Sequence, residues 1–481
     1  MPRRTLLTVL AVAAAAVALR TLAFSGLDLY TDEAYYWLWS TRPAAGYFDH
    51  PPMVAWIIWA SSRLLPGELG VRLLFLLLGG LTILFAALAA WEVEPSPRAP
   101  VYAALLAASA PMLHLGGAMA LPDGPVAAAF TGALCLLARA RGRRWLAAGV
   151  LVGLALLSKY TAALLAPTLV LLVFWDRELR DELRTVWPWL GGAVAVLVFL
   201  PNLIWNAQHG FIAILFQLRH GFRTGTTLAA FLEYAAAILG SGGLVSVPLG
   251  LHLAARARSS AERRLGAAAL VTIAVTLYSA WRGSAEVNWP SHSYPALAAL
   301  AGAWLARRGG RVAGWATGVQ AALGVVVIVG FAVELHTPRF LEGSVVVRRF
   351  HAGKELGRMA REAAKEGCAA IGAPEGCGPD PFVYPSSFQY AGHYAYYSGW
   401  LRLGPAEERP SQLDLWNETP RPGEPFLWAG QDRPPPERFR RSIRAEGEGP
   451  TLRFRVTYRG QWTRDGVVTP FLRYQGGQLT R

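Results

Sequence analysis

The chain alternates between long apolar runs and short polar breaks, and this pattern indicates its fold class. Apolar runs of about twenty residues recur, and each is long enough to cross the hydrocarbon core of a bilayer. We predict a polytopic α-helical membrane protein with about eleven transmembrane helices. The predicted spans cover residues 5–24, 71–91, 99–118, 124–138, 145–157, 161–175, 186–203, 227–253, 265–281, 294–306 and 312–333.

Two apolar segments need separate treatment. Residues 53–65 are too few to cross comfortably and include Arg63, so we predict an interfacial helix there. The first run follows Met-Pro-Arg-Arg, as a signal peptide would, but no small-x-small cleavage site ends it and residues 28–33 add acidic groups at once. We therefore predict an uncleaved first helix with the N-terminus in the cytoplasm.

Composition and charge support this class and add an orientation. Of the 481 residues, 53% are hydrophobic and 16% are charged, and the mean hydropathy is +0.30. The predicted inner loops carry 17 Lys and Arg residues and the outer loops 7, which is the positive-inside bias. The net charge of +14 therefore reflects topology in a bacterial inner membrane. No basic stripe is interleaved with aromatic residues, so we expect no nucleic-acid partner.

Residues 334–481 lack the long apolar runs of the preceding part of the chain and show another pattern. Short alternating segments such as "TLRFRVTYRG" stand between Pro-rich turns such as "DRPPPERF". We predict a transmembrane domain over residues 1–333, with a first outer loop at 25–70, and a small extracytoplasmic α+β domain over 334–481. Cys368 and Cys377 flank a short segment of that domain, where a disulfide is chemically allowed.

Four predicted outer segments place ionisable groups in otherwise apolar sequence, which is costly close to a bilayer unless the groups have a function. Asp32 and Glu33 begin "DEAYYWLW", where they either cap a helix or, with the aromatic side chains from Tyr35 onward, sit at the headgroup level. Asp49 and His50 in "YFDHPP" form either a plain turn or part of a site, and both are competent metal ligands, so a divalent cation stays open.

The other two segments are "LPDGP" and "LSKYT". Asp123 suits a turn as well as a site. Lys159 is the only lysine in the first 353 residues, and a buried ammonium needs a partner such as a phosphate or a carboxylate. Further outer residues that can line a polar cavity, or simply belong to loops, are Arg219, Arg223, Asn288 and His292.

These motifs resemble one family. "TDEAYYWLWS…GYFDHPPMVAW", "LPDGP", "GLALLSKYTA" and "NWPSHSYPAL" are similar, in matching order over about residues 1–310, to polyprenyl-phosphate-sugar-dependent GT-C glycosyltransferases. The nearest groups are relatives of protein O-mannosyltransferases and of lipid A aminoarabinose transferases. The chain departs from the latter at Asp49 and His50, where they tend to carry Glu-Lys before the double proline.

The resemblance implies an inverting transferase with a polyprenyl-phosphate-linked sugar donor and a lipid, glycan or protein acceptor in the cell envelope. It implies that Asp32 is the catalytic aspartate, with Glu33 beside it, and that Asp123 is the acidic residue of the second outer loop. A base activates the acceptor hydroxyl, and a cation stabilises the departing phosphate. Lys159, Arg219 or Arg223 fits that second role; Tyr35, Asp49, His50, Asn288 and His292 complete the predicted substrate-binding set.

Rival functions belong to other classes. A secondary transporter would show two related halves and charges near the middle of the membrane. Here the predicted ionisable groups gather at one face, and the sequence shows no internal repeat. A flippase or a ligase of lipid-linked saccharides would share the lipid substrate and the topology, so these two alternatives remain open.

Overall fold

The structure is a computed structural model. It describes residues 1–221, 225, 227–283, 285–341, 344–351, 353–354, 356–358, 360–362, 380–385, 387–406, 409–418, 426–430, 451–464, 467–475 and 479–480, the last four ranges as backbone only. Arg223, Cys368 and Cys377 lie outside the described residues. The chain forms two compact units. We call residues 1–25, 44–65 and 69–330 the helical unit, and residues 26–43, 66–68 and 331–481 the C-terminal unit.

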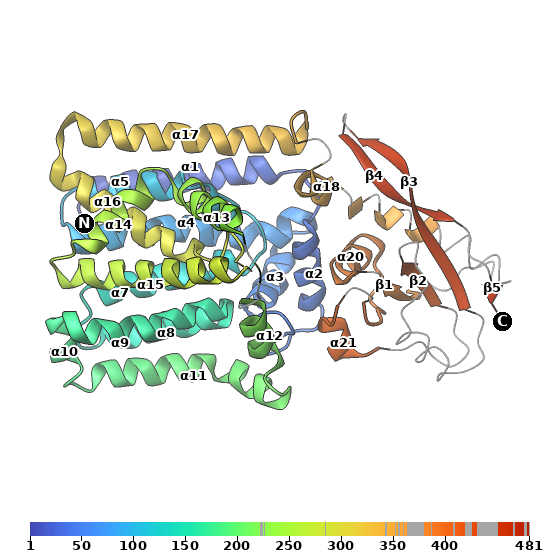
Figure 1. Cartoon of the computed structure of the whole chain (residues 1–481), viewed down its shortest axis with the longest axis horizontal. Coiled ribbons are helices and arrows are strands. Elements are labelled where there is room, and N and C mark those ends of the chain that lie inside the picture. The colour runs from blue at the N-terminus through green and yellow to red at the C-terminus, as the bar shows by residue number, and fades with distance from the viewer. Residues whose placement is uncertain are drawn as a thin grey trace. The chain divides into compact units, whose positions relative to one another are not determined.

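The helical unit consists of helices that run mostly along one common direction (Figure 1). In chain order they are α1 (Arg3–Phe24), α3 (Met53–Leu64), α4 (Gly67–Val93), α5 (Arg98–Ala108), α6 (Pro111–Gly116), α7 (Asp123–Ala138), α8 (Arg144–Ser158), η1 (Tyr160–Leu164), α9 (Leu165–Trp175), α10 (Arg177–Glu182), α11 (Trp187–Gln208), α12 (Ile212–Gly221), α13 (Leu228–Gly242), α14 (Ser246–Ala255), α15 (Ser260–Arg282), η2 (Ser291–Ser293), α16 (Tyr294–Arg308) and α17 (Gly310–His336).

Each predicted span falls on a helix or a pair of helices, but the count of eleven is not confirmed. Among the described residues, five helices are long and apolar enough to cross a membrane: α1, α4, α11, α15 and α17. The number rises to six if α13 and α14 form one broken span. The remaining apolar helices, such as α7 and α8, are shorter. Nearly all residues of α7 are buried, whereas α9 exposes large apolar side chains such as Phe174 and Trp175.

Two predicted spans are interrupted. Residues 99–118 divide into α5 and α6, because Pro111 begins a new helix and supplies no backbone N–H to the preceding one. Residues 227–253 divide into α13 and α14, which meet at 101°. Gly243 lies at the bend with φ of +106°, a conformation that L side chains rarely adopt.

Small residues allow the helices of this unit to pack closely. The two buried clusters are dominated by alanine, for example at Ala103, Ala268 and Ala299. Gly149 of α8 and Gly191 of α11 bring two helix backbones together, since a Cβ on Gly149 would collide with the Gly191 carbonyl oxygen. Lipid tails are as apolar as leucine, so close van der Waals packing of this kind is what holds membrane helices together.

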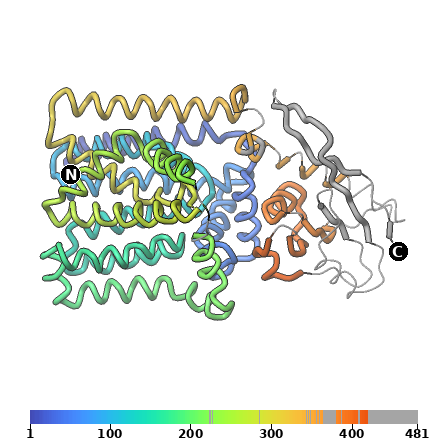
Figure 2. The backbone as a smooth tube through the Cα atoms, in the orientation of Figure 1, coloured from blue at the N-terminus to red at the C-terminus, as the bar shows by residue number. Residues whose placement is uncertain are grey.

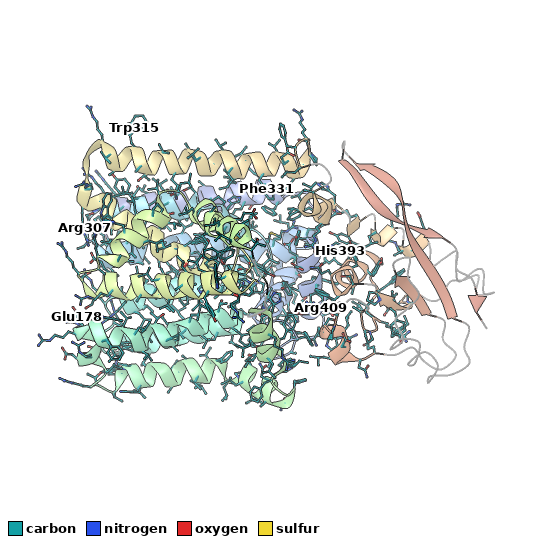
Figure 3. All side chains as sticks on the ribbon, in the orientation of Figure 1. Glu178, Arg307, Trp315, Phe331, His393 and Arg409 are labelled. Carbon is teal, nitrogen blue, oxygen red and sulfur yellow. The ribbon has the colours of Figure 1, made fainter. Side chains whose placement is uncertain are left out.

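The loops that we predicted as inner are joined to one another by ion pairs. Arg307 contacts Glu94 at 2.7 Å and Glu262 at 2.5 Å, and Arg264 contacts Asp176 at 2.6 Å. Figure 3 shows Arg307 and Glu178 at the same end of the helical unit. The alternation of loops between the two ends therefore agrees with the prediction, while the cytoplasmic orientation stays a prediction.

The pair of Asp176 and Arg264 gives a stability prediction. Both side chains are buried, and Asp176 also accepts hydrogen bonds from the Ser260 hydroxyl and the Leu179 N–H. Burial alone would raise the pKa of the Asp176 carboxyl, but the hydrogen bond and charge of Arg264, helped by the other donors, lower it below its ordinary value. Removing one partner of a buried pair typically costs about 3–5 kcal/mol.

We expect Arg264→Met to lower the free energy of unfolding by roughly that amount. Because the folded pKa of Asp176 is depressed, the contribution of the pair is present above the unfolded pKa and is lost as the pH falls through the folded one. Thermal unfolding of the purified protein in detergent, measured against pH, checks both points. An Arg264→Met protein as stable as the parent near neutral pH would contradict the prediction.

The C-terminal unit contains α2 (Thr31–Ser40) together with elements from the end of the chain. These are α18 (Val345–His351), β1 (Phe382–Pro385), α20 (Phe388–His393), the π-helical turn η3 (Tyr394–Ser398), α21 (Gln412–Trp416), β2 (Phe426–Gly430), β3 (Thr451–Arg464), β4 (Val467–Gln475) and β5 (Leu479–Thr480). Figure 2 shows the chain path in the same orientation.

One sheet gathers the strands of this unit in the order β1-β2-β3-β4, and β5 also pairs with β3. β1 and β2 are parallel, with Phe382 opposite Phe426, and β2 and β3 are parallel as well. β3 and β4 are antiparallel, with an irregular register between Tyr458 and Gln461. Helices and a mixed sheet thus occur together in the region for which we predicted an α+β domain.

Charged contacts fix the first-loop segment within the C-terminal unit. The Lys354 ammonium contacts Asp28 at 3.0 Å and Glu68 at 2.8 Å, and the Asp28 side chain is fully buried. The Tyr397 hydroxyl accepts a hydrogen bond from the Leu29 N–H at 2.7 Å. Segments far apart in the sequence therefore build one unit, and α2 is held by residues from the end of the chain.

Candidate active site

The helical unit brings three of the predicted polar segments together around Asp123. Asp123 begins α7, and its carboxylate contacts the Lys159 ammonium at 2.9 Å. Asn288 donates to the other carboxylate oxygen at 3.2 Å, and the Ser291 hydroxyl donates to the first at 3.2 Å. Sequence analysis predicted Asp123, Lys159 and Asn288 for one site, and the structure brings these three together.

A helix break places Lys159. α8 ends at Ser158, and Lys159 has extended backbone angles before η1 begins at Tyr160. The side chains of Lys159 and Asp123 are 8% and 6% exposed, so this pair is held away from water. Attraction between charges is much stronger in such surroundings than in solvent. A cation fixed there can bind an anionic group that enters the site.

A second polar group, more exposed, follows in the loop before η2. The Glu286 carboxylate contacts His220 of α12 at 3.4 Å and accepts from the Trp289 indole N–H at 3.3 Å. The hydrogen bond with His220 and the positive charge of Lys159 lower the pKa of Glu286 from its ordinary value. Glu286 therefore stays ionised near neutral pH and adds negative charge near Lys159.

His292 and Arg219 occupy different surroundings. His292 is buried, and its ring packs edge-on against Phe130 with centroids 4.8 Å apart; the charges of Lys159 and Asp123 both act on it. Arg219 is exposed on α12. The structure thus places His292 beside the Asp123 group, whereas the contacts of that group do not include Arg219.

The turn with Asp49 and His50 packs on α11 and α12. The Gln217 amide donates to the Asp49 carbonyl oxygen at 2.7 Å, and the Asn202 amide donates to the Ala45 carbonyl oxygen at 2.8 Å. The Asp49 side chain is buried and that of His50 is half-buried. Their predicted roles in substrate binding stay predictions.

A metal site was left open at Asp49 and His50. Within the described part of the chain, no three His, Cys, Asp or Glu side chains come together as a ligand set.

In the C-terminal unit, Asp32 lies in the first turn of α2, where the helix dipole favours a negative charge. Its carboxylate accepts a hydrogen bond from the Gln389 amide of α20 at 2.5 Å. The guanidinium of Arg349 on α18 donates to the Tyr30 hydroxyl at 3.0 Å, and the charges of Arg349 and Asp32 attract each other. Asp32 is half-buried, so one side of it remains accessible.

Glu33 and Tyr35 have contacts of another kind. The Glu33 carboxylate is buried and accepts from the Tyr30 N–H at 2.9 Å, which caps the start of α2. The Tyr35 hydroxyl accepts from the Gln412 N–H at 2.9 Å, and its ring packs against Trp39 and Phe388. A catalytic Glu33 and a substrate-binding Tyr35 stay predictions, and both side chains have packing partners.

Several residues were missed. Ser291 stands between the predicted residues Asn288 and His292 in "NWPSHS", and a serine hydroxyl in that motif is able to donate to a carboxylate. Glu286 lies in the loop before η2, and only the fold shows that it meets His220. Gln389 had no local indication, because its partner Asp32 is 357 residues away.

Comparison with known proteins supports the predicted family. Residues 49–205 match the family described as dolichyl-phosphate-mannose-protein mannosyltransferase. The chain is 28% identical over 370 residues to the lipid A galacturonosyltransferase RgtD of Rhizobium johnstonii, covering 72% of this chain and 75% of RgtD. These matches support the resemblance to the GT-C glycosyltransferase superfamily. The predicted resemblance is thereby confirmed, and the protein is a glycosyltransferase of the membrane.

Solved structures show the same fold. The GT-C enzyme ArnT from Cupriavidus metallidurans in the apo state matches with a TM-score of 0.62 and 17% identity, covering 92% of each chain. The structure of that ArnT bound to undecaprenyl phosphate matches with a TM-score of 0.61 and 16% identity, covering 93% of each chain. The ArnT-like fold thus extends through both units of this glycosyltransferase.

Proposed function

We propose that this GT-C enzyme moves a sugar from a polyprenyl-phosphate donor to lipid A or a closely related envelope lipid. The observation that carries the proposal is the buried pair of Lys159 and Asp123, a fixed cation within a unit built of membrane helices. RgtD acts on lipid A, and the solved ArnT binds undecaprenyl phosphate. RgtD favours a lipid acceptor over a protein acceptor, and ArnT favours a polyprenyl-phosphate donor.

The proposed reaction is a single displacement. Asp32 takes the proton of the acceptor hydroxyl, and the hydroxyl oxygen attacks the anomeric carbon of the donor sugar. The bond from that carbon to the phosphate oxygen breaks, and its electron pair stays on the polyprenyl phosphate. Attack from the face opposite the leaving group inverts the anomeric carbon.

The displacement needs a base and a stabilising cation. A hydroxyl is a poor nucleophile, and a positioned base accelerates its attack by about 10²–10⁴-fold. Negative charge grows on the departing phosphate, and the Lys159 ammonium in a site with little water stabilises it. Asp123 holds that ammonium in place, and Asn288 and Ser291 hold the carboxylate in turn.

The positive-inside bias supports a reaction on the outer face of the inner membrane, with residues 334–481 outside the cytoplasm. Four of the loops that we predicted as outer meet in the Asp123 and Glu286 contacts. A transferase that works there needs a donor already carried across the membrane, and a polyprenyl phosphate provides such a carrier.

A reconstituted assay tests the function. Purified protein in nanodiscs is mixed with undecaprenyl-phosphate-linked galacturonate or aminoarabinose and lipid A, and products are followed by mass spectrometry. We expect lipid A to gain the mass of one sugar residue with one of these donors. A peptide acceptor and nucleotide-linked sugars serve as controls. Transfer from a nucleotide-linked sugar but from no polyprenyl-phosphate donor would contradict the proposal.

A further inference from the structure

The Asp32 carboxylate is held by a residue from the far end of the chain. The Gln389 side-chain amide donates to Asp32 Oδ1 at 2.5 Å, and both residues belong to the C-terminal unit. A hydrogen bond to an ionised carboxylate is stronger than one between neutral groups. This contact fixes rotation of the Asp32 carboxylate about its Cβ–Cγ bond.

Contacts on both sides of Gln389 hold α20 against α2. The Ser387 hydroxyl accepts the Gln389 N–H at 3.3 Å and so caps the start of α20. One turn later, Gly392 lies directly against the backbone of α2, where a Cβ would collide with Ala34 and Tyr35. The Gln389 amide is therefore presented from a fixed helix turn and is not a mobile surface group.

Arg349 of α18 and Asp32 attract each other. Burial opposes the charged form of Arg349, yet its hydrogen bond with Tyr30 and the charge of Asp32 raise its pKa above the ordinary value. The titratable groups around Arg349 and Asp32 include Tyr390 of α20, together with Tyr30 and Glu33 from the start of α2. Gln389 adds a neutral donor to this set.

We propose that Gln389 is a positioning residue that orients the Asp32 carboxylate as the base of the transfer reaction and stabilises its ionised form. The inference rests on the proposed function. Gln389 itself touches no reacting atom in this scheme. Its contribution comes from restricting Asp32 to a productive orientation, and small misplacements of a catalytic group can cost about 10²-fold in rate.

Gln389→Met tests the inference, because methionine has a similar length and no N–H donor. We expect kcat to fall about ten- to a hundredfold, with the KM for the polyprenyl-phosphate donor changed less than about twofold. Without the donor, the ionised carboxylate is less favoured, so the acidic limb of the kcat/KM profile moves to higher pH. Gln389→Glu places a like charge beside Asp32 and should move this limb further in the same direction.

Ser387→Ala is the matched control, because it weakens the cap of α20 and leaves the Gln389 amide in place. We expect a lower Tm and an unchanged acidic limb. The inference is overturned if Gln389→Met keeps the kcat and pH profile of the parent, or if Ser387→Ala reproduces the pH shift. Should Gln389→Met fail to fold, the pH profile of Gln389→Glu decides by the same criteria.

Asp32→Asn separates failure of this inference from failure of the proposed function. If Asp32→Asn is inactive and Gln389→Met behaves like the parent, only the positioning role of Gln389 is contradicted. An active Asp32→Asn enzyme removes the base on which both proposals depend.

Discussion

Asp32→Asn is expected to lower kcat for sugar transfer by about 10²–10⁴-fold, the usual contribution of a positioned general base. The carboxamide oxygen of asparagine can still accept the hydrogen bond from Gln389, so the packing of α2 on α20 should survive. The amide cannot take the acceptor proton. The measurement is single-turnover transfer with the purified variant, together with its thermal unfolding curve.

Glu33→Gln is the neighbouring control. The Glu33 carboxylate caps the Tyr30 N–H from a buried position, so its replacement should lower the Tm while most of the kcat remains. Loss of transfer in Glu33→Gln at unchanged stability would instead give Glu33 the catalytic role that the sequence left shared between the two carboxylates. Near-parental turnover of Asp32→Asn would remove Asp32 from the base role.

Hydrophobic patterning was sufficient to predict the helices, but not how many cross the membrane. A run of apolar residues has the same appearance whether the helix faces lipid or lies among other helices, and α7 is of the second kind. The bend between α13 and α14 follows Gly-Ser-Gly-Gly at residues 240–243, which marks a flexible point but not an angle of 101°. Such an angle depends on what the two helices pack against.

The candidate site, like the fold, was only partly predictable from the sequence. Charge in apolar sequence identified Asp32, Asp123 and Lys159, because an uncompensated charge there is costly. Which groups compensate that charge depends on contacts across many residues: Ser291 reaches Asp123 over 168 positions of the chain. Glutamine and serine are common and uncharged, so no local pattern distinguishes the ones that orient a carboxylate.

Lys159→Met is expected to have the second large effect, on stability and on catalysis together. Among the described residues, the substitution leaves the buried Asp123 carboxylate with Asn288 and Ser291 as its hydrogen-bond donors. Breaking a buried pair typically costs about 3–5 kcal/mol, so the Tm should fall markedly. If Lys159 also stabilises the departing phosphate, kcat for transfer should fall as well.

The double variant Lys159→Met/Asp123→Asn separates these two roles. It removes both charges, so no unpaired carboxylate remains buried, and we expect much of the lost stability to return. Transfer should stay lost, because no cation faces the donor phosphate. Thermal unfolding and single-turnover transfer are measured on the two single variants and the double variant. Recovery of both stability and turnover in the double variant would show that Lys159 serves only as the partner of Asp123.

Lys159→Arg adds a test of shape. It keeps the charge but presents a larger, planar group, so it should retain more stability than Lys159→Met and still impair donor use.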